Sequence, residues 1–266
     1  MSACIIIPAR YASSRFPGKP LAPLRGAGGT AKTLIQRSWE AGMAVPGVEA
    51  CYVATDDDRI AQETEKFGGK VLMTAESCAN GTERCADAIK GLETPPDIVV
   101  NLQGDAPLTP PWFITALIEA MQADPDIEVA TPVLRCDEHA LEGFLADRQA
   151  GRVGATTAVF DRNGRALYFS KEVIPYTGGK FSEDGICPVF HHVGVYAYRP
   201  KTLSAYAAME QGPLERWEGL EQLRFMENGT PVHCVEVDAG GAKFWELNNP
   251  EDTPRIEAVL AEQGIA

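Results

Sequence analysis

The sequence has a shortage of positive charge and no long apolar run. Lys and Arg total 24 against 37 Asp and Glu, which gives a formal net charge of −13. This balance argues against broad non-specific binding to nucleic acid or to an anionic membrane surface. No stretch approaches the roughly 18 consecutive apolar residues of a membrane span, and the first residues lack a signal-peptide layout. We therefore expect a cytoplasmic protein with no nucleic-acid partner and no membrane partner.

Cysteine pairs at metal-binding spacing are also missing. The seven cysteines are scattered and include no Cys-x-x-Cys, which is typical of reduced core thiols and not of a disulfide framework or a zinc site. The sequence also lacks both Gly-x-x-x-x-Gly-Lys-Ser/Thr and Gly-x-Gly-x-x-Gly. These absences argue against a P-loop NTPase and against an NAD-dependent oxidoreductase with a classical dinucleotide fold.

The order of apolar patterns predicts the fold class. Strand-like runs at 4–8, 51–55, 71–73, 98–103 and 129–133 alternate with helical patterns at 31–43, 57–67, 82–90 and 111–123. In the second half, Asn163-Gly164 separates two runs, 155–160 and 166–170, as in an antiparallel hairpin. A strand over 191–198, a helix over 214–227, a strand over 232–237 and a helix over 251–262 follow. We predict an α/β fold with a central, mostly parallel sheet and a smaller β-rich lobe.

The loop after the first strand carries the most informative segment. This phosphate loop extends from Pro8 to Pro20, begins with Pro8-Ala9 and includes three cations, Arg10, Arg15 and Lys19. Open α/β sheets bind ligands at the carboxyl ends of their strands, and small residues there let backbone N–H groups approach a phosphate. The loop therefore predicts a triphosphate site. The alternative is an exposed basic loop without a ligand.

Asp105 closely follows the apolar run 98–103, which lacks the alternation of a half-exposed strand. A carboxylate in this position can hold Mg²⁺ against phosphates, and Gly104 leaves room for a nucleotide. The position of Asp105 therefore suits a carboxylate that binds Mg²⁺ beside the phosphates of a nucleotide. A turn or helix-capping role for Asp105 is the alternative.

Several segments resemble the sugar nucleotidyltransferases, and within them the 3-deoxy-manno-octulosonate (Kdo) cytidylyltransferase family, also called CMP-Kdo synthetases. These segments occur at 6–21, 53–56, 80–84, 100–105, 167–170, 192–199 and 220–224. The resemblance covers nearly the whole chain and implies a Rossmann-like, glycosyltransferase-A-like fold and a homodimer. It also implies formation of CMP-Kdo and pyrophosphate from CTP and Kdo, for lipopolysaccharide or capsule synthesis.

The resemblance assigns roles to individual residues. It implies that Lys19, Arg10 and Asp105 are catalytic. The implied nucleotide-binding set is Pro8, Ala9, Arg10, Lys19, Asn80, Gly81, Arg84 and Gln103. The implied sugar-acid-binding set is Arg15, Gln103, His192, Tyr196, Glu221 and Gln222, with Ser170 and Lys171 at a further edge. Two alternatives stay open: Glu83 and Arg84 as an exposed ion pair, and His192 as a structural histidine.

Two positions depart from the family pattern. Ala106 replaces a Glu beside Asp105, and Asn248 replaces the Asp that the family uses as its second metal ligand. An amide oxygen can coordinate Mg²⁺ but adds no negative charge, so we expect weaker metal binding or a changed metal preference. Asp238 and Glu246 are candidate substitutes for the lost carboxylate. The stretch 244–247 is also unlike the common family pattern, which favours a related sugar acid as an alternative acceptor.

We expect a single nucleotidyltransferase domain over 1–266. Residues 1–150 form its nucleotide-binding part, 151–210 a β-rich acceptor and dimerisation lobe, and 211–266 a part that returns to the main sheet. Two further interpretations stay open: CMP activation of a related 2-keto-3-deoxy sugar acid, and a CTP-binding regulatory homologue that has lost pyrophosphate release.

Overall fold

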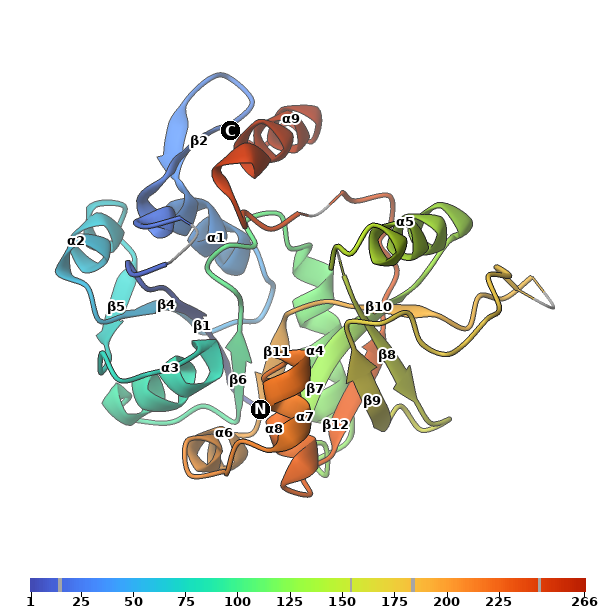
Figure 1. Ribbon diagram of the computed structural model, residues 1–266. Coiled ribbons are helices and arrows are strands. Elements are labelled where there is room, and N and C mark those ends of the chain that lie inside the picture. The colour runs from blue at the N-terminus through green and yellow to red at the C-terminus, as the bar shows by residue number, and fades with distance from the viewer. Residues whose placement is uncertain (14–15, 154, 183–184, 244) are drawn as a thin grey trace.

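The computed structural model describes residues 1–13, 16–153, 155–182, 185–243 and 245–266. Within them, a large sheet has the strand order β5–β4–β1–β6–β11–β7–β10–β8–β9, and β12 pairs with β7 (Figure 1). Its strands are β1 Ala3–Pro8, β4 Ala50–Thr55, β5 Lys70–Met73, β6 Ile98–Asn101, β7 Val129–Arg135, β8 Thr156–Phe160, β9 Ala166–Ser170, β10 Phe190–His192, β11 Tyr196–Tyr198 and β12 Val232–Glu236. The α/β fold class is confirmed.

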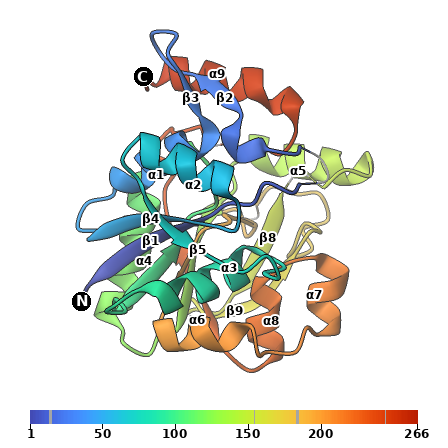
Figure 2. The same cartoon turned by 90° about the vertical axis from the view of Figure 1, so that its left-hand side faces the viewer.

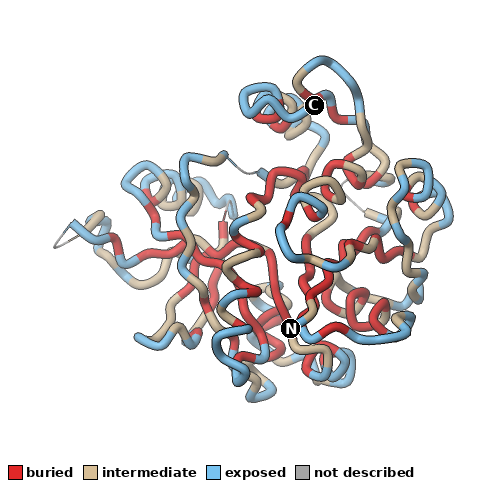
Figure 3. The backbone as a smooth tube through the Cα atoms, turned by 180° about the vertical axis from the view of Figure 1, so that it is seen from behind, coloured by how far each residue is buried: buried red, intermediate tan, exposed pale blue. Residues whose placement is uncertain are grey.

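Helices cover both faces of the sheet, as the two views in Figures 1 and 2 show. They are α1 Leu34–Met43, α2 Asp58–Lys66, α3 Gly81–Ala88, α4 Pro111–Ala123, α5 Glu138–Gln149, α6 Pro200–Tyr206, α7 Pro213–Glu218, α8 Gln222–Glu227 and α9 Thr253–Glu262, with 3-10 turns at Lys19–Leu21 (η1), Ile89–Gly91 (η2) and Pro250–Asp252 (η3). One core cluster joins α1, α2 and α4 to the sheet, and a second joins α3, α6 and α8. The buried backbone accordingly runs through the centre of the molecule (Figure 3).

The first half of the chain follows the predicted parallel order. Strand β1 lies between β4 and β6 and is parallel to both. Ile5, Ile6 and Ile7 are fully buried because helices cover both faces of this strand. The Ala9 N–H donates to the Ala54 carbonyl at 2.9 Å just beyond the β1–β4 ladder. The loops that leave β1, β4 and β6 therefore start at one edge of the sheet, where the sequence places the phosphate loop and Asp105.

The strands of the second half extend the same sheet. The predicted hairpin is confirmed, because β8 and β9 pair antiparallel. The single strand expected over 191–198 is wrong. Strand β10 pairs with β7 and β8, whereas β11 pairs with β6 and with the beginning of β7. The backbone changes course at Val193–Val195, where the Val195 N–H donates to the Val193 carbonyl at 2.7 Å.

Two helical predictions also need correction. The helix expected over 214–227 consists of α7 and α8, separated at Gly219, whose φ of 62° favours glycine. Residues that carry a side chain rarely adopt this left-handed backbone conformation, whereas glycine does. Helix α7 therefore ends at Gly219, and α8 begins three residues later. The helical pattern at 31–43 starts only at Leu34, because residues 31–33 form strand β3 (Ala31–Thr33), which pairs with β2 (Pro23–Arg25).

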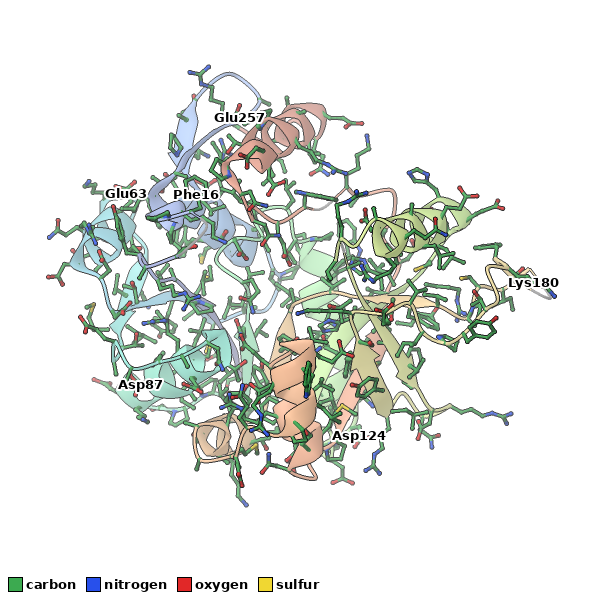
Figure 4. All side chains as sticks on the ribbon, viewed as in Figure 1. Phe16, Glu63, Asp87, Asp124, Lys180 and Glu257 are labelled. Carbon is green, nitrogen blue, oxygen red and sulfur yellow. The ribbon has the colours of Figure 1, made fainter. Side chains whose placement is uncertain are left out.

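The β2–β3 hairpin packs beside the last helix, α9. Buried Arg37 holds the hairpin by donating from Nε and Nη2 to the Leu24 carbonyl, at 3.1 and 2.9 Å. The Glu257 carboxylate, labelled on α9 in Figure 4, accepts the Arg25 N–H at 2.8 Å. Residues from opposite ends of the chain thus close one side of the molecule. Among the described residues, no helix has the length and apolar character needed to cross a membrane.

Candidate active site

The phosphate loop begins where β1 ends. Pro8 and Ala9 are buried, while Arg10 is exposed. Arg10 borders a hollow of about 460 Å³, and the other described residues that line it are Tyr11, Ala12, Ser13 and Pro17. The loop closes at Gly18, whose N–H donates to the Tyr11 carbonyl at 2.9 Å. Arg15, assigned to the sugar acid from the sequence, lies outside the described residues.

Lys19 and Asp105 come together from positions far apart in the sequence. The Lys19 Nζ lies 2.6 Å from the Asp105 Oδ2, and their side chains are 16% and 25% exposed. Gly104 lets the backbone before Asp105 pass close to the end of β1, because a Cβ at that position would lie only 2.6 Å from the Pro8 carbonyl oxygen. The predicted phosphate loop and the predicted metal-binding aspartate therefore lie side by side.

The start of α3 meets the same edge of the sheet. Asn80 caps the helix, since its Oδ1 accepts the Glu83 N–H at 2.8 Å. The next residue, Gly81, lies against the phosphate loop: a Cβ there would be 3.3 Å from the Pro8 Cγ and 3.5 Å from the Gln103 Oε1. Four residues assigned to the nucleotide site, Pro8, Asn80, Gly81 and Gln103, are thus brought together.

Arg84 occupies a different setting from the rest of this group. It is buried, its Nη1 pairs with the Asp56 Oδ1 at 3.1 Å, and the same nitrogen donates to the Thr74 Oγ1 at 2.6 Å. Glu83 instead pairs with Arg224 at 2.9 Å. The alternative of an exposed Glu83–Arg84 ion pair is therefore wrong. Arg84 holds α3 against the end of β4, and direct contact with a nucleotide stays a prediction.

The residues assigned to the sugar acid lie mostly in a buried, neutral environment. The His192 Nε2 lies 3.0 Å from the Thr131 Oγ1, and burial lowers the pKa of His192 to about 3, so the ring is neutral at pH 7. The Tyr196 hydroxyl donates to the Gln222 Oε1 at 2.9 Å. Burial raises the pKa of Tyr196, which keeps the phenol protonated. These groups can direct hydrogen bonds without carrying charge.

Glu221 is the carboxylate that the resemblance assigns to the sugar acid. Its Oε2 accepts from the Thr82 N–H at 3.1 Å and from the Thr82 Oγ1 at 2.7 Å. Burial raises the pKa of Glu221, while the hydrogen bonds from Thr82 act in the opposite direction. Glu221 therefore links the acceptor residues to the start of α3. At the further edge, the Ser170 Oγ and the Lys171 N–H both donate to Glu218, at 2.6 and 2.8 Å.

Asn101 is a polar residue of this region that the sequence analysis gave no role. It is fully buried on β6, opposite Tyr196 in the ladder with β11. Within the described part of the chain, neither its Oδ1 nor its Nδ2 has a hydrogen-bond partner, and the same holds for the Gln222 Nε2. Buried polar atoms are normally paired, so these atoms leave hydrogen-bonding capacity beside the acceptor residues. The signal was an asparagine within the apolar run 98–102.

The Asn248 segment lies against Asp105. The Leu247 N–H donates to the Asp105 carbonyl at 2.9 Å, and the Asn248 Nδ2 donates to the Glu246 Oε2 at 3.4 Å. Asp238, the other candidate substitute, is exposed, and its Oδ1 accepts a backbone N–H of its own turn at 2.8 Å. Carboxylate and amide oxygens suit Mg²⁺, which commonly takes one or two carboxylates together with substrate phosphates. The described residues include no cluster of three or more His, Cys, Asp or Glu that could hold a metal by itself.

The chain is similar to known proteins over nearly its whole length. The family model described as cytidylyltransferase matches residues 4–236. A 3-deoxy-manno-octulosonate cytidylyltransferase from Maricaulis maris (strain MCS10) is 44% identical over 99% of this chain and 99% of the relative. An 8-amino-3,8-dideoxy-manno-octulosonate cytidylyltransferase from Shewanella sp. (strain W3-18-1) is 41% identical over 98% of this chain and 99% of the relative. A solved structure of CMP:2-keto-3-deoxy-manno-octonic acid synthetase complexed with CTP matches with a TM-score of 0.83 and 34% identity, over 99% of this chain and 100% of that chain.

Proposed function

This chain belongs to the cytidylyltransferase family, and from that premise we propose that it forms CMP-Kdo and pyrophosphate from CTP and Kdo. One observation carries the proposal. Gln103 lies between two glycines, with its Oε1 3.5 Å from a Cβ built at Gly81 and its Cγ 4.0 Å from one built at Gly194. Gly81 belongs to the nucleotide side, and Gly194 connects the strands of His192 and Tyr196. The two substrates can therefore meet at Gln103.

The reaction joins the anomeric hydroxyl oxygen of Kdo to the α-phosphorus of CTP. As this O–P bond forms, the bond from the α-phosphorus to the bridging oxygen breaks, and pyrophosphate leaves with that electron pair. The hydroxyl proton passes to solvent or to a phosphate oxygen. Positioning of the two substrates and stabilisation of negative charge are the protein's main contributions. Lys19 and Arg10 supply positive charge to the triphosphate and to the departing pyrophosphate.

We assign Mg²⁺ to Asp105 and Asn248. Bound there, the ion would neutralise phosphate charge and so favour attack on the α-phosphorus. Lys19 and Asp105 lie 2.6 Å apart, so the cation and the metal-binding carboxylate address the same phosphates. The amide of Asn248 contributes an oxygen without a charge, which weakens metal binding relative to a second carboxylate.

The acceptor is held by groups of the second half. His192 and the Tyr196–Gln222 pair provide neutral hydrogen-bonding groups, and Glu221 accepts hydrogen bonds from sugar hydroxyls. Arg15 is proposed to bind the carboxylate of the sugar acid. A homodimer and a cytoplasmic location remain predictions of this proposal. The second candidate acceptor is 8-amino-3,8-dideoxy-manno-octulosonate, the substrate named for the Shewanella relative.

Pyrophosphate release tests the proposal. The assay contains CTP, Kdo and Mg²⁺, omits each in turn, and replaces CTP by GTP, ATP or UTP. We expect release only when CTP, Kdo and Mg²⁺ are all present. Binding of CTP without release in the presence of either sugar acid would contradict the proposal and favour the regulatory interpretation.

A further inference from the structure

Glu246 lies beside the residues assigned to the acceptor. It belongs to the segment between β12 and η3, which the Leu247 N–H fastens to the Asp105 carbonyl at 2.9 Å. One carboxylate oxygen, Oε2, accepts from the Asn248 Nδ2 at 3.4 Å. The other, Oε1, lies 3.6 Å from the position that a Cβ on Gly194 would take. The carboxylate therefore stands over the glycine that separates His192 from Tyr196.

Two further observations place this carboxylate on the acceptor side of the site. The Gln103 Cγ lies 4.0 Å from the same Cβ position, so Glu246 and Gln103 flank one glycine. Burial raises the pKa of Tyr196, and the negative charges of Glu221 and, to a smaller extent, Glu246 act in the same direction. A charge felt by the Tyr196 phenol is close enough to act on a ligand bound there.

We infer that Glu246 determines acceptor specificity: its carboxylate accepts hydrogen bonds from the sugar acid and favours an acceptor that carries an ammonium group over one that carries only hydroxyls. The inference rests on the proposed function. The substrate feature that Glu246 recognises is an ammonium group.

Charge explains why an ammonium group gains most from this residue. A sugar acid is an anion, so a carboxylate near its binding site repels it unless donors on the ligand compensate. A hydroxyl compensates with one neutral donor, whereas an ammonium group compensates with a charge-assisted hydrogen bond, which is about twice as strong. Kdo and its 8-amino derivative, the substrates named for the two relatives, differ in this way and form a matched pair of probes.

The test compares the ratio of kcat/KM for 8-amino-3,8-dideoxy-manno-octulosonate to kcat/KM for Kdo. The variants are Glu246→Gln, which removes the charge, and Glu246→Asp, which keeps it. Glu251→Gln is the matched control, because Glu251 is an exposed glutamate of the adjacent turn η3. We expect Glu246→Gln to lower the ratio about tenfold or more, the effect of one charged hydrogen bond. Glu246→Asp keeps the ratio above that of Glu246→Gln, and Glu251→Gln leaves it unchanged.

An unchanged ratio in a folded, CTP-binding Glu246→Gln variant would overturn the inference. An equal loss with both acceptors, together with weaker Mn²⁺ binding measured in the presence of CTP, would also overturn it, because Glu246 would then serve the metal. If Glu246→Gln fails to fold, the Glu246→Asp variant is measured instead. A kcat/KM ratio near one in that variant, which means no preference between the two acceptors, would contradict the inference. Failure of the wild-type protein to release pyrophosphate with either acceptor would instead contradict the proposed function itself.

Discussion

The two sides of the proposed site, the predicted phosphate side and the predicted acceptor side, differ in charge and in burial. On the phosphate side, Arg10 is exposed, and Lys19 and Asp105 form a charged pair whose side chains are 16% and 25% exposed. On the acceptor side, His192 and Tyr196 are each 6% exposed, and burial keeps both of them neutral. A triphosphate is recognised by its charge, which partly exposed cations supply at little desolvation cost. A sugar requires hydrogen bonds of fixed direction, which buried groups hold in place.

Replacement of Asp105 should break the phosphate side most severely. Asp105→Ala removes the carboxylate assigned to Mg²⁺ and the partner of Lys19, so we expect kcat to fall by about 10³-fold or more. Pyrophosphate release at saturating Mg²⁺ measures this effect. Asp238→Ala removes an exposed carboxylate and should leave kcat unchanged. Normal turnover of Asp105→Ala would show that Asp105 does not bind the catalytic Mg²⁺.

The two histidines of β10 predict how stability depends on pH. Burial lowers the pKa of His192 to about 3 and that of His191 to about 4. Below the unfolded-state pKa of about 6.5 the unfolded chain binds protons that the folded protein does not. The free energy of unfolding should therefore fall as pH decreases from about 6.5 towards 4, by up to about 1.4 kcal/mol per pH unit for each histidine.

Urea denaturation at pH 7 and pH 5 measures this dependence. His192→Asn should reduce the difference between the two pH values. His139→Asn replaces an exposed histidine of α5 and should leave the difference as in the wild type. An equal pH dependence in wild type and His192→Asn would show that His192 takes up its proton in the folded protein.

The acceptor side can also be weakened without change of charge. Tyr196→Phe removes the hydroxyl that donates to the Gln222 Oε1 at 2.9 Å, next to a Gln222 Nε2 and an Asn101 side chain that already lack described partners. Loss of one buried hydrogen bond should raise the KM for the sugar acid about tenfold. Steady-state kinetics with each substrate varied separately measures it. An equal rise in the KM for CTP would contradict the division into two sides.

The smallest predicted effect concerns Asn248. Asn248→Asp restores a second negative charge near Asp105 and should lower the Mg²⁺ concentration for half-maximal rate a few-fold. Titration of the rate with Mg²⁺ measures the shift, and Asn249→Asp, at the adjacent position, is the control. An unchanged Mg²⁺ titration for Asn248→Asp would remove this residue from the metal site.

The parallel half of the fold was accessible from the sequence because its signals are local. Buried strands in parallel sheets read as apolar runs, and their carboxyl ends meet at one edge, so Lys19 and Asp105 could be placed together. The second half depends on long-range pairing. Strands β10 and β11 are separate because they pair with different residues of β7. The apolar pattern of 191–198 does not reveal this change of pairing.

The candidate site shows the same division. Its glycines, such as Gly104, lie where two backbone segments approach closely. These glycines belong to the sequence motifs, so their positions could be read from the sequence. The burial of Arg84 depends on Asp56, and the engagement of Glu221 depends on Thr82, contacts that join separate segments. The sequence made Glu246 a candidate metal ligand. Its position beside Gly194, which only the structure shows, favours a role in acceptor binding instead.

Calorimetric binding of CTP without a sugar acid tests most directly whether the two substrates bind to different sides. Two variants are compared with the wild type, Lys19→Met on the phosphate side and Tyr196→Phe on the acceptor side. We expect Lys19→Met to raise the Kd for CTP about tenfold or more, the effect of one charged hydrogen bond, and Tyr196→Phe to leave the Kd unchanged. A similar loss of CTP binding in both variants, or a loss in Tyr196→Phe only, would contradict it.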